Sequence, residues 1–254
     1  MADRADESDT PLVRAQDLAI GYGRKVIQEH LDFEVQAHEI FAILGGSGCG
    51  KSTLLRTLIG MQRPLAGEVS IAGVDQLPPP LDTPPPFGVS FQSGALFGSR
   101  SLLENVALPL EKWTDLDRRA VEAIALARLR LVGLGGFENF LPAEISGGMQ
   151  KRAGIARALA LEPRLLFLDE PSAGLDPVTS VELDELLKVL NGNLGVTVVL
   201  VTHELDSIFR IATRCIMLEK DAQGLVAEGD PRVLRDESDD PRVRRFFNRL
   251  PSSA

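Results

Sequence analysis

The chain has 254 residues, of which 44% are hydrophobic and 25% charged, a composition typical of a folded domain with a substantial core. Its formal charge of −9 argues against a general binder of the nucleic-acid backbone, because such proteins usually carry a basic face. The longest apolar run, residues 194–201 (LGVTVVLV), is far shorter than the roughly 18 residues that a membrane span needs.

The N-terminal residues MADRADESDT lack the basic start and the apolar stretch of a secretory signal. We therefore interpret residues 1–10 as an acidic disordered tail and expect a cytoplasmic chain. Cys49 and Cys215 are too few for a disulfide framework or a zinc site, so we expect any metal to arrive with a nucleotide.

Short β-type stretches run from Leu12 to Val35, and the apolar run at residues 39–44 (EIFAIL) predicts a buried strand that ends in a glycine cluster. Residues 52–59 have no helix breaker and predict a helix that begins directly after that cluster. Ser101 and Glu104 form a capping-box pattern, and residues 115–131 carry apolar positions at helical spacing.

Buried strands are predicted again at residues 165–168 and 196–201, alternating with helical stretches at residues 178–190 and 204–212. The order predicts an α/β fold with a helical insert at roughly residues 93–162. Residues 77–86 (LPPPLDTPPP) predict an exposed linker, because proline lacks the backbone donor that helices and sheets need. The alternative for this segment is a docking motif.

Residues 45–52 read GGSGCGKS and match the phosphate-loop pattern G-x-x-x-x-G-K-[ST] between a predicted strand and a predicted helix. Glycines let backbone N–H groups approach phosphate oxygens, the helix N-terminus favours an anion, and a lysine adds a charge. The alternative is a glycine-rich turn that matches by chance. The candidate nucleotide-binding residues of this loop are Gly45, Gly46, Ser47, Gly48, Cys49, Gly50, Lys51, Ser52 and Thr53, with Ser52 also a candidate Mg²⁺ ligand.

Cys49 lies inside this loop, where N–H groups and Lys51 would favour its thiolate form. We therefore expect bound ATP to protect Cys49 from alkylation. The alternative is that Cys49 serves only as a small filler.

Asp169 and Glu170 follow the buried strand at residues 165–168, at the edge where ligands of open α/β sheets bind. Neighbouring strand residues point in different directions, so Asp169 can serve Mg²⁺ while Glu170 serves a water molecule as general base. The alternative is an acidic helix cap before Pro171.

Ser146, Gly147 and Gly148 open a predicted helix at residues 151–161, and this turn resembles the signature of the ABC ATPase family. The resemblance implies a P-loop NTPase of the ABC ATPase type over residues 11–229, with a mixed sheet core, an antiparallel β part and an inserted helical subdomain. It also implies ATP and Mg²⁺ as cofactors. In that family the signature of one subunit completes the phosphate site of a second copy.

Four further positions resemble family residues. Tyr22 is similar to the aromatic residue that stacks on adenine, and Gln92 to the glutamine that binds Mg²⁺ and links the site to the membrane partner. Asp176 ends the stretch SAGLD, which resembles the loop between subunits, and His203 resembles the switch histidine at the γ-phosphate. Tyr22 as a β-core residue and His203 as a structural residue remain the alternatives. Ile145 and Met149 depart from the generic signature.

The resemblance and the spacing together name Glu170 and His203 as catalytic and Ser52, Gln92 and Asp169 as metal ligands. We expect ATP to close a dimer and Glu170 to orient or deprotonate the attacking water.

A narrower resemblance is to the ATPases of MCE-associated lipid transporters, including the Mla type that moves phospholipid. It implies a second copy of the ATPase, an integral-membrane permease, an MCE-domain protein and attachment to the cytoplasmic face of the inner membrane. Residues 77–86 and 98–101 depart from that group. The segments that carry the resemblance are FQSGALF (91–97), ENVALPL (104–110), SGGMQKRAGIARAL (146–159), HELDSIF (203–209) and DPRVRRFF (240–247).

Two segments are candidates for contacts with partners. The apolar residues after Gln92, which are Ala95, Leu96, Phe97, Leu102 and Leu103, would dock the permease, unless they belong to the core of the helical insert. The tail, residues 230–254, is predicted to be helical; it either packs two phenylalanines on its own chain or contacts a partner subunit.

Two rival functions are weighed against lipid transport. A soluble ABC ATPase acting on nucleic acid or ribosomes would usually carry two cassettes or a long coiled coil, and neither sustained heptads nor a basic charge supports it. An importer of amino acids or another polar solute would use the same ATPase residues.

Overall fold

The computed structural model describes residues 10–74 and 82–250. The tail expected at residues 1–10 lies almost wholly outside them, and so do residues 77–81 of the proline-rich segment. Residues 82–86 are described and lie in no helix or strand. Within the described ranges, no helix is long and apolar enough to cross a membrane.

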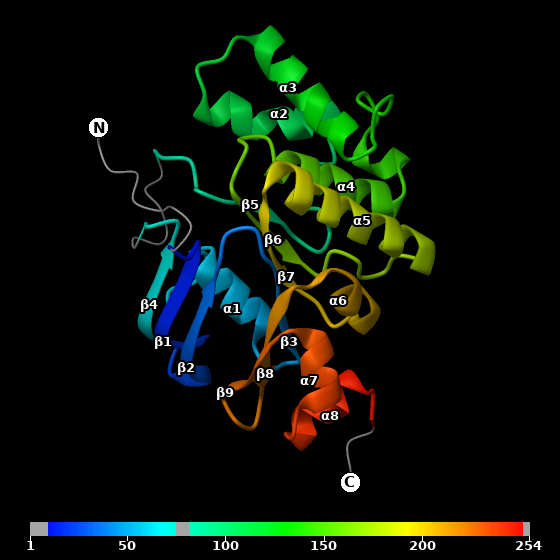
Figure 1. Cartoon of the computed structure of the whole chain (residues 1–254). Coiled ribbons are helices and arrows are strands. Elements are labelled where there is room, and N and C mark those ends of the chain that lie inside the picture. The colour runs from blue at the N-terminus through cyan, green and yellow to red at the C-terminus, as the bar shows by residue number, and fades with distance from the viewer. Residues whose placement is uncertain (1–9, 75–81, 251–254) are drawn as a thin grey trace, which may run out of the picture.

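Two sheets form the framework (Figure 1). The smaller is antiparallel, in the order β2-β1-β4, and the larger has the order β5-β6-β7-β3-β8-β9, with only β9 antiparallel to its neighbour. This arrangement confirms the predicted α/β class with an antiparallel part. The strands are β1 (Val13–Tyr22), β2 (Lys25–Val35), β3 (Ile40–Gly45), β4 (Ala66–Ile71), β5 (Gly88–Ser90), β6 (Leu165–Asp169), β7 (Thr197–Val201), β8 (Arg214–Glu219) and β9 (Gly224–Gly229).

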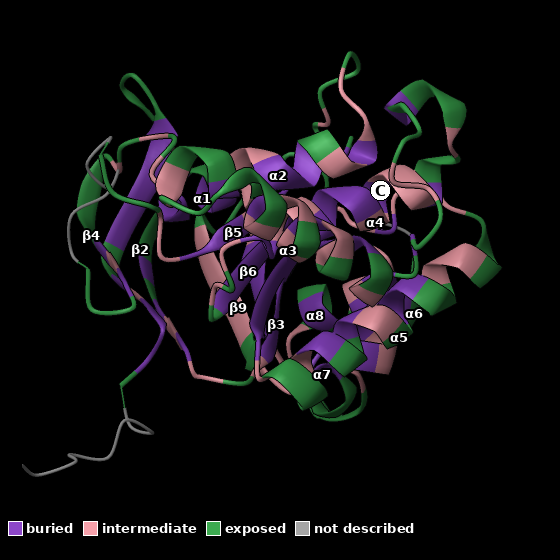
Figure 2. Cartoon of the chain, turned by 90° about the horizontal axis from the view of Figure 1, so that it is seen from above, coloured by how far each residue is buried: buried purple, intermediate pink, exposed green. Residues whose placement is uncertain are grey.

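Both faces of the larger sheet are covered, which explains why its strands are apolar without alternation. In β3, Ala42 and Leu44 pack into one core cluster while Phe41 and Ile43 pack into the other. Figure 2 shows the central strands buried between layers of helices and the smaller sheet.

Helices surround this sheet (Figure 1). Helix α1 contacts β1 of the smaller sheet and β3, β6 and β7 of the larger one. Helix α5 contacts α6 and β7. Helices α2 to α4 lie in the segment between β5 and β6 and contact one another. The helices are α1 (Lys51–Leu58), α2 (Leu102–Trp113), α3 (Arg118–Leu131), α4 (Gly147–Ala158), α5 (Pro177–Leu194), α6 (Leu205–Ile211), α7 (Pro231–Glu237) and α8 (Pro241–Phe247), with a 3₁₀ turn at Pro142–Glu144.

The predicted capping box is confirmed at the start of α2. Glu104 N–H donates to Ser101 Oγ at 3.2 Å, and the N–H of Ser101 donates to the Glu104 carboxylate at 2.7 Å. The helix predicted over residues 115–131 begins later, because Asp117 caps α3 by accepting from the N–H of Ala120.

The C-terminal helices fold back onto their own chain. Val243 and Phe247 of α8 are buried in the core, and the Phe247 ring lies 5.7 Å from that of Phe209 in α6. Arg249 also forms an ion pair with Asp206 at 3.0 Å. The tail therefore supports α6, the helix that follows His203.

Both cysteines are buried, which corrects the expectation of a reactive Cys49. The residue Cys49 is 1% exposed, and burial raises the pKa of its thiol more than the nearby Lys51 lowers it. Burial also raises the pKa of Cys215 to about 12. Cys49 is thus a small filler beneath the phosphate loop, and its side chain is not available to a nucleotide.

The packing of α8 makes a quantitative prediction about stability. Phe247→Ala should lower the free energy of unfolding by about 3 to 5 kcal/mol, because it leaves a cavity in the core. Leu250→Ala, at a position that is 56% exposed, is the matched control and should change it by less than about 0.5 kcal/mol. Denaturant unfolding measures both; equal midpoints for the two variants would contradict the packing.

Burial of the two thiols predicts slow alkylation of the native chain, with or without ATP. Because both folded-state pKa values are raised, the thiolates form only as the pH rises above the ordinary thiol range, and Cys215 should resist until the chain unfolds. Iodoacetamide labelling followed by intact mass, in native buffer and in denaturant, measures this. Native labelling of Cys49 as fast as in denaturant would show that the thiol is accessible.

Candidate functional site

Three parallel strands bring the predicted site together at one edge of the larger sheet. Val201 of β7 pairs with Ile43 of β3 on one side and with Asp169 of β6 on the other. The phosphate loop follows β3, Glu170 follows β6 and His203 follows β7. The carboxyl ends of these strands therefore place phosphate-binding, acidic and histidine groups side by side.

The phosphate loop depends on glycine at several positions. Gly48 and Gly50 have φ of +74° and +106°, in the left-handed region. A Cβ on Gly45 would lie 2.4 Å from the carbonyl oxygen of Leu218, whereas a Cβ on Gly46 would enter open space. The loop thus packs tightly on its inner side and leaves the outer side of Gly46 open, where a phosphate would approach the N-terminus of α1.

Lys51 and Ser52 lie at the start of α1. The ammonium of Lys51 donates to the carbonyls of Gly45 at 2.8 Å and Gly46 at 3.0 Å, so it lies over the loop. Ser52, on the same first turn of α1, is exposed. Ser47 and Gly48 in the loop before the helix are exposed as well. Thr53 is buried, and its hydroxyl forms a hydrogen bond of 3.2 Å with the hydroxyl of Tyr22.

Tyr22 ends β1 with 51% of its surface exposed, so it is no core residue. The hydrogen bond with Thr53 lowers the pKa of the Tyr22 hydroxyl, and Arg56 acts in the same direction. The contact fixes the ring at the hydroxyl end and leaves much of it open to solvent.

Gln28 of β2 supports the phosphate loop from below, and the sequence did not reveal it. Its side-chain amide is fully buried and donates to the carbonyl of Cys49 at 2.6 Å and to that of Glu219 at 3.0 Å. Polar residues alternate irregularly with apolar ones in this strand, so the sequence does not indicate that its glutamine is buried or that it contacts the loop. It depends on the smaller sheet lying beside the end of β8.

Glu170 adopts a left-handed backbone with φ of +48°, and its N–H donates to the carbonyl of Val201 at 2.8 Å. One carboxylate oxygen lies 2.9 Å from Nδ1 of His203. Oε2, the second oxygen, is buried, and no hydrogen-bond partner for it exists among the described residues. The backbone conformation and the histidine contact favour a role in the site over a helix cap, and the next helix is capped instead by Asp176.

Asp169 ends β6 with a buried Oδ1 that likewise has no partner among the described residues. Burial raises the pKa of this carboxyl and the neighbouring Glu170 raises it further, while Arg56 and Lys51 oppose them. A carboxylate with an unpaired buried oxygen fits a hard cation such as Mg²⁺. The described residues contain no group of three His, Cys, Asp or Glu side chains that could hold a metal by themselves.

Gln92 is exposed in the turn after β5. This turn is held by α4, because the Arg157 guanidinium donates to the carbonyls of Gly94 and Ala95 at 3.0 and 2.8 Å. Gly154 of α4 allows close packing there, since a Cβ would lie 3.1 Å from Gly94.

The signature turn lies at the start of α4. Ser146 caps the helix by accepting from the N–H of Met149 at 3.3 Å, and the outer side of Gly147 is open. Gly148 packs on α5, where a Cβ would lie 2.6 Å from the Thr179 side chain. Among the described residues, no hydrogen bond joins this turn to the phosphate loop of the same chain.

Asp176 caps α5 by accepting from the N–H groups of Val178 and Thr179 at 3.0 and 3.1 Å. These bonds and that with the Thr179 hydroxyl lower the pKa of its carboxyl. Its side chain therefore has a local role at the helix start.

The expected permease contact is corrected in part. Leu102 is fully buried and Leu103 packs against the same core, so both belong to the helical insert. Phe97 is 57% exposed and lines a mainly apolar groove of about 920 Å³ with Pro85, Leu108 and Trp113.

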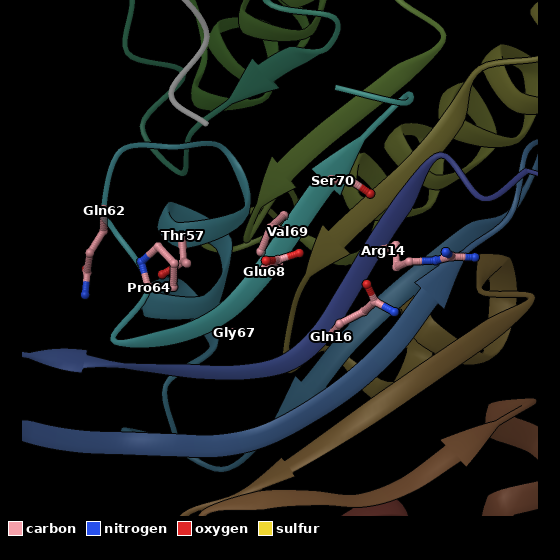
Figure 3. Close-up of a pocket in the computed structure, with 9 residues that line it drawn as sticks. All are labelled: Arg14, Gln16, Thr57, Gln62, Pro64, Gly67, Glu68, Val69 and Ser70. Atoms are coloured by element: carbon pink, nitrogen blue, oxygen red, sulfur yellow. The ribbon is translucent and has the colours of Figure 1, made fainter. Parts of the chain in front are cut away.

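A second groove, of about 620 Å³, lies between α1 and the smaller sheet (Figure 3). Polar side chains of β1 and β4, including Arg14, Gln16 and Glu68, line it. None of the lining residues belongs to the predicted site.

Comparisons with known proteins identify the family of this chain. The ABC transporter family model matches residues 28–173. The chain is 40% identical to the probable ribonucleotide transport ATP-binding protein mkl of Mycobacterium leprae over 240 residues, which cover 93% of this chain and 68% of the relative. It is 37% identical to the intermembrane phospholipid transport system ATP-binding protein MlaF of Escherichia coli, over 96% of this chain and 91% of the relative.

Solved structures share the fold. The dimeric ATP-binding cassette MJ0796 bound to ADP and Pi has a TM-score of 0.75 at 30% identity, covering 86% of this chain and 98% of the other. The structure of cbiO1 from Clostridium perfringens has a TM-score of 0.81 at 25% identity, over 96% and 97% of the two chains. With the family match over more than half its length and relatives that align along nearly all of it, the chain belongs to the ABC transporter family.

Proposed function

We propose that this chain is the ATP-hydrolysing motor of a membrane transporter that moves phospholipid. The observation that carries the ATPase part is the Glu170 carboxylate at the strand edge that also bears the phosphate loop. One of its oxygens lies 2.9 Å from His203, and the other is buried with no partner among the described residues. A carboxylate so placed can accept a proton from water attacking a γ-phosphate.

The proposed roles follow the geometry. Backbone N–H groups of residues 45–53, with the Lys51 ammonium, would bind the phosphates. Ser52, Gln92 and Asp169 would hold Mg²⁺, which supplies positive charge to the phosphate oxygens. His203 orients the Glu170 carboxylate, and the exposed Tyr22 ring would stack on adenine.

The turn Ser146–Gly148 would complete the site of a second copy of the chain. The exposure of Ser146 and Gly147, the open side of Gly147 and the lack of a bond to its own phosphate loop in the described residues support this role. The dimer of the MJ0796 cassette supports it further. Asp176, at the end of the SAGLD loop, would lie near the same contact.

Phospholipid is proposed as cargo on the alignment with MlaF over nearly the whole chain and on the Mla-like segments of the sequence. The partners would be an integral-membrane permease and an MCE-domain protein, with the chain at the cytoplasmic face of the inner membrane. The groove beside Phe97 would receive the permease.

A polar solute is the second candidate, favoured by the mycobacterial relatives, whose name specifies ribonucleotide transport. The ATPase residues serve either cargo equally. The permease decides between them.

Replacement of the proposed general base tests the ATPase mechanism. Glu170→Gln should lower kcat about 100-fold or more, because general base catalysis contributes about 10²- to 10⁴-fold, and ATP binding should persist. Glu185→Gln, on the exposed face of α5, is the matched control. Steady-state ATP hydrolysis and nucleotide binding are measured; unchanged hydrolysis by Glu170→Gln would rule out the role.

Purification of the chain from its native membrane tests the cargo. Mass spectrometry of the co-purifying proteins and extracted small molecules should detect a permease, an MCE-domain protein and phospholipid. A permease accompanied by a solute receptor and no phospholipid would favour the polar-solute candidate instead.

A further inference from the structure

Lys151 of α4 is a buried charged residue with no role in the mechanism above. Its residue surface is 8% exposed. The ammonium donates to the carbonyl of Ala173 at 2.6 Å and to that of Glu170 at 3.2 Å. It therefore joins the helix that begins at the signature turn to the segment that begins at the proposed general base.

Burial of an ammonium is unfavourable unless hydrogen bonds replace its hydration. Burial lowers the pKa of Lys151, and the charge of Glu170 opposes that shift. The two carbonyl acceptors offset the lost hydration. A methionine would fill a similar volume without that cost, so packing alone does not require a lysine at this position.

The segment that Lys151 contacts has an unusual backbone. Glu170 is a non-glycine residue with φ of +48°, and Gly174 follows with φ of +76°. Such a conformation persists only where surrounding contacts hold it. The N–H of Glu170 donates to the carbonyl of Val201 in β7, while the Glu170 carbonyl accepts both from the N–H of Ala173 at 3.2 Å and from the Lys151 ammonium.

These bonds fix the peptide units on both sides of the Glu170 Cα, and hence the direction of its side chain, and the Lys151 ammonium joins the carbonyls at both ends of the turn from Glu170 to Ala173. We propose that Lys151 is a positioning residue, which holds the backbone of residues 170–173 so that the Glu170 carboxylate lies against His203. The inference rests on the proposed ATPase function. Through Lys151, the helix that begins at the signature turn would hold the backbone of the general base in the same chain.

The test compares three variants of the full-length chain, purified with the membrane proteins that accompany it. Lys151→Met removes the donors and keeps the length of the side chain, Lys151→Arg keeps donors, and Lys188→Met changes a lysine of α5 whose side chain is 46% exposed. ATP hydrolysis is measured across ATP concentrations, and the thermal midpoint is measured for each variant.

We expect Lys151→Met to lower kcat about 10- to 100-fold, because a small displacement of a catalytic group has an effect of that size. Its KM for ATP should stay within about twofold, since the phosphate loop is unchanged. Lys151→Arg should recover much of kcat, and Lys188→Met should match the wild type. A loss confined to kcat and recovered by arginine would not arise from a general loss of packing.

The inference is overturned if Lys151→Met retains wild-type kcat, or if kcat, ATP affinity and the thermal midpoint all fall together without recovery by arginine. Should Lys151→Met fail to fold, Lys151→Ser, which is polar but too short to reach the two carbonyls, decides: a lowered kcat at unchanged KM supports the role, and full kcat overturns it. A wild-type chain without ATPase activity would instead show that the proposed function is wrong.

Discussion

The site depends on the backbone pairing of three parallel strands. Val201 pairs with β3 and β6, and its carbonyl also accepts the N–H of Glu170. Because side chains alternate along a strand, a shift of one residue in this register would turn Asp169 toward the other face and move Glu170 away from His203. The position of these residues along the sheet edge is thus set by backbone hydrogen bonds.

The second constraint is electrostatic. Asp169 and Glu170 are adjacent, partly buried, and each keeps an unpaired buried oxygen among the described residues. Burial and mutual repulsion raise the pKa of Asp169, whereas Lys51 and Arg56 lower it. A divalent cation bound beside Asp169 would favour the ionised form of this carboxyl.

Buried polar side chains join the elements around this edge. Gln28 holds the phosphate loop, Lys151 holds the segment after β6, and Asp184 of α5 accepts from Ser207 and Arg210 of α6. Each joins elements that are distant in the chain, and two of the three bind backbone carbonyls. Supports of this kind restrict the motion of catalytic groups, at a cost in desolvation.

The sequence by itself determined the local features, which depend only on residues that are neighbours in the chain. The phosphate loop follows from its spacing and from glycines that reach left-handed conformations, the start of α2 follows from its capping box, and the buried strands follow from their apolar runs. The predicted positions of Asp169, Glu170 and His203 after such strands were sufficient to expect them at one edge.

For several residues the sequence left open whether the side chain has a functional role or only packs in the core. Only the tertiary structure decided this, because the surroundings of these residues come from segments that are distant in the chain. Cys49 is buried against the loop rather than activated, Leu102 and Leu103 fill the helical insert, and the tail packs on α6. Gln28 and Lys151 gave no local signal, because their partners are backbone carbonyls of other elements. A sequence pattern reports what a residue can do, whereas its burial and partners depend on how the sheets and helices pack.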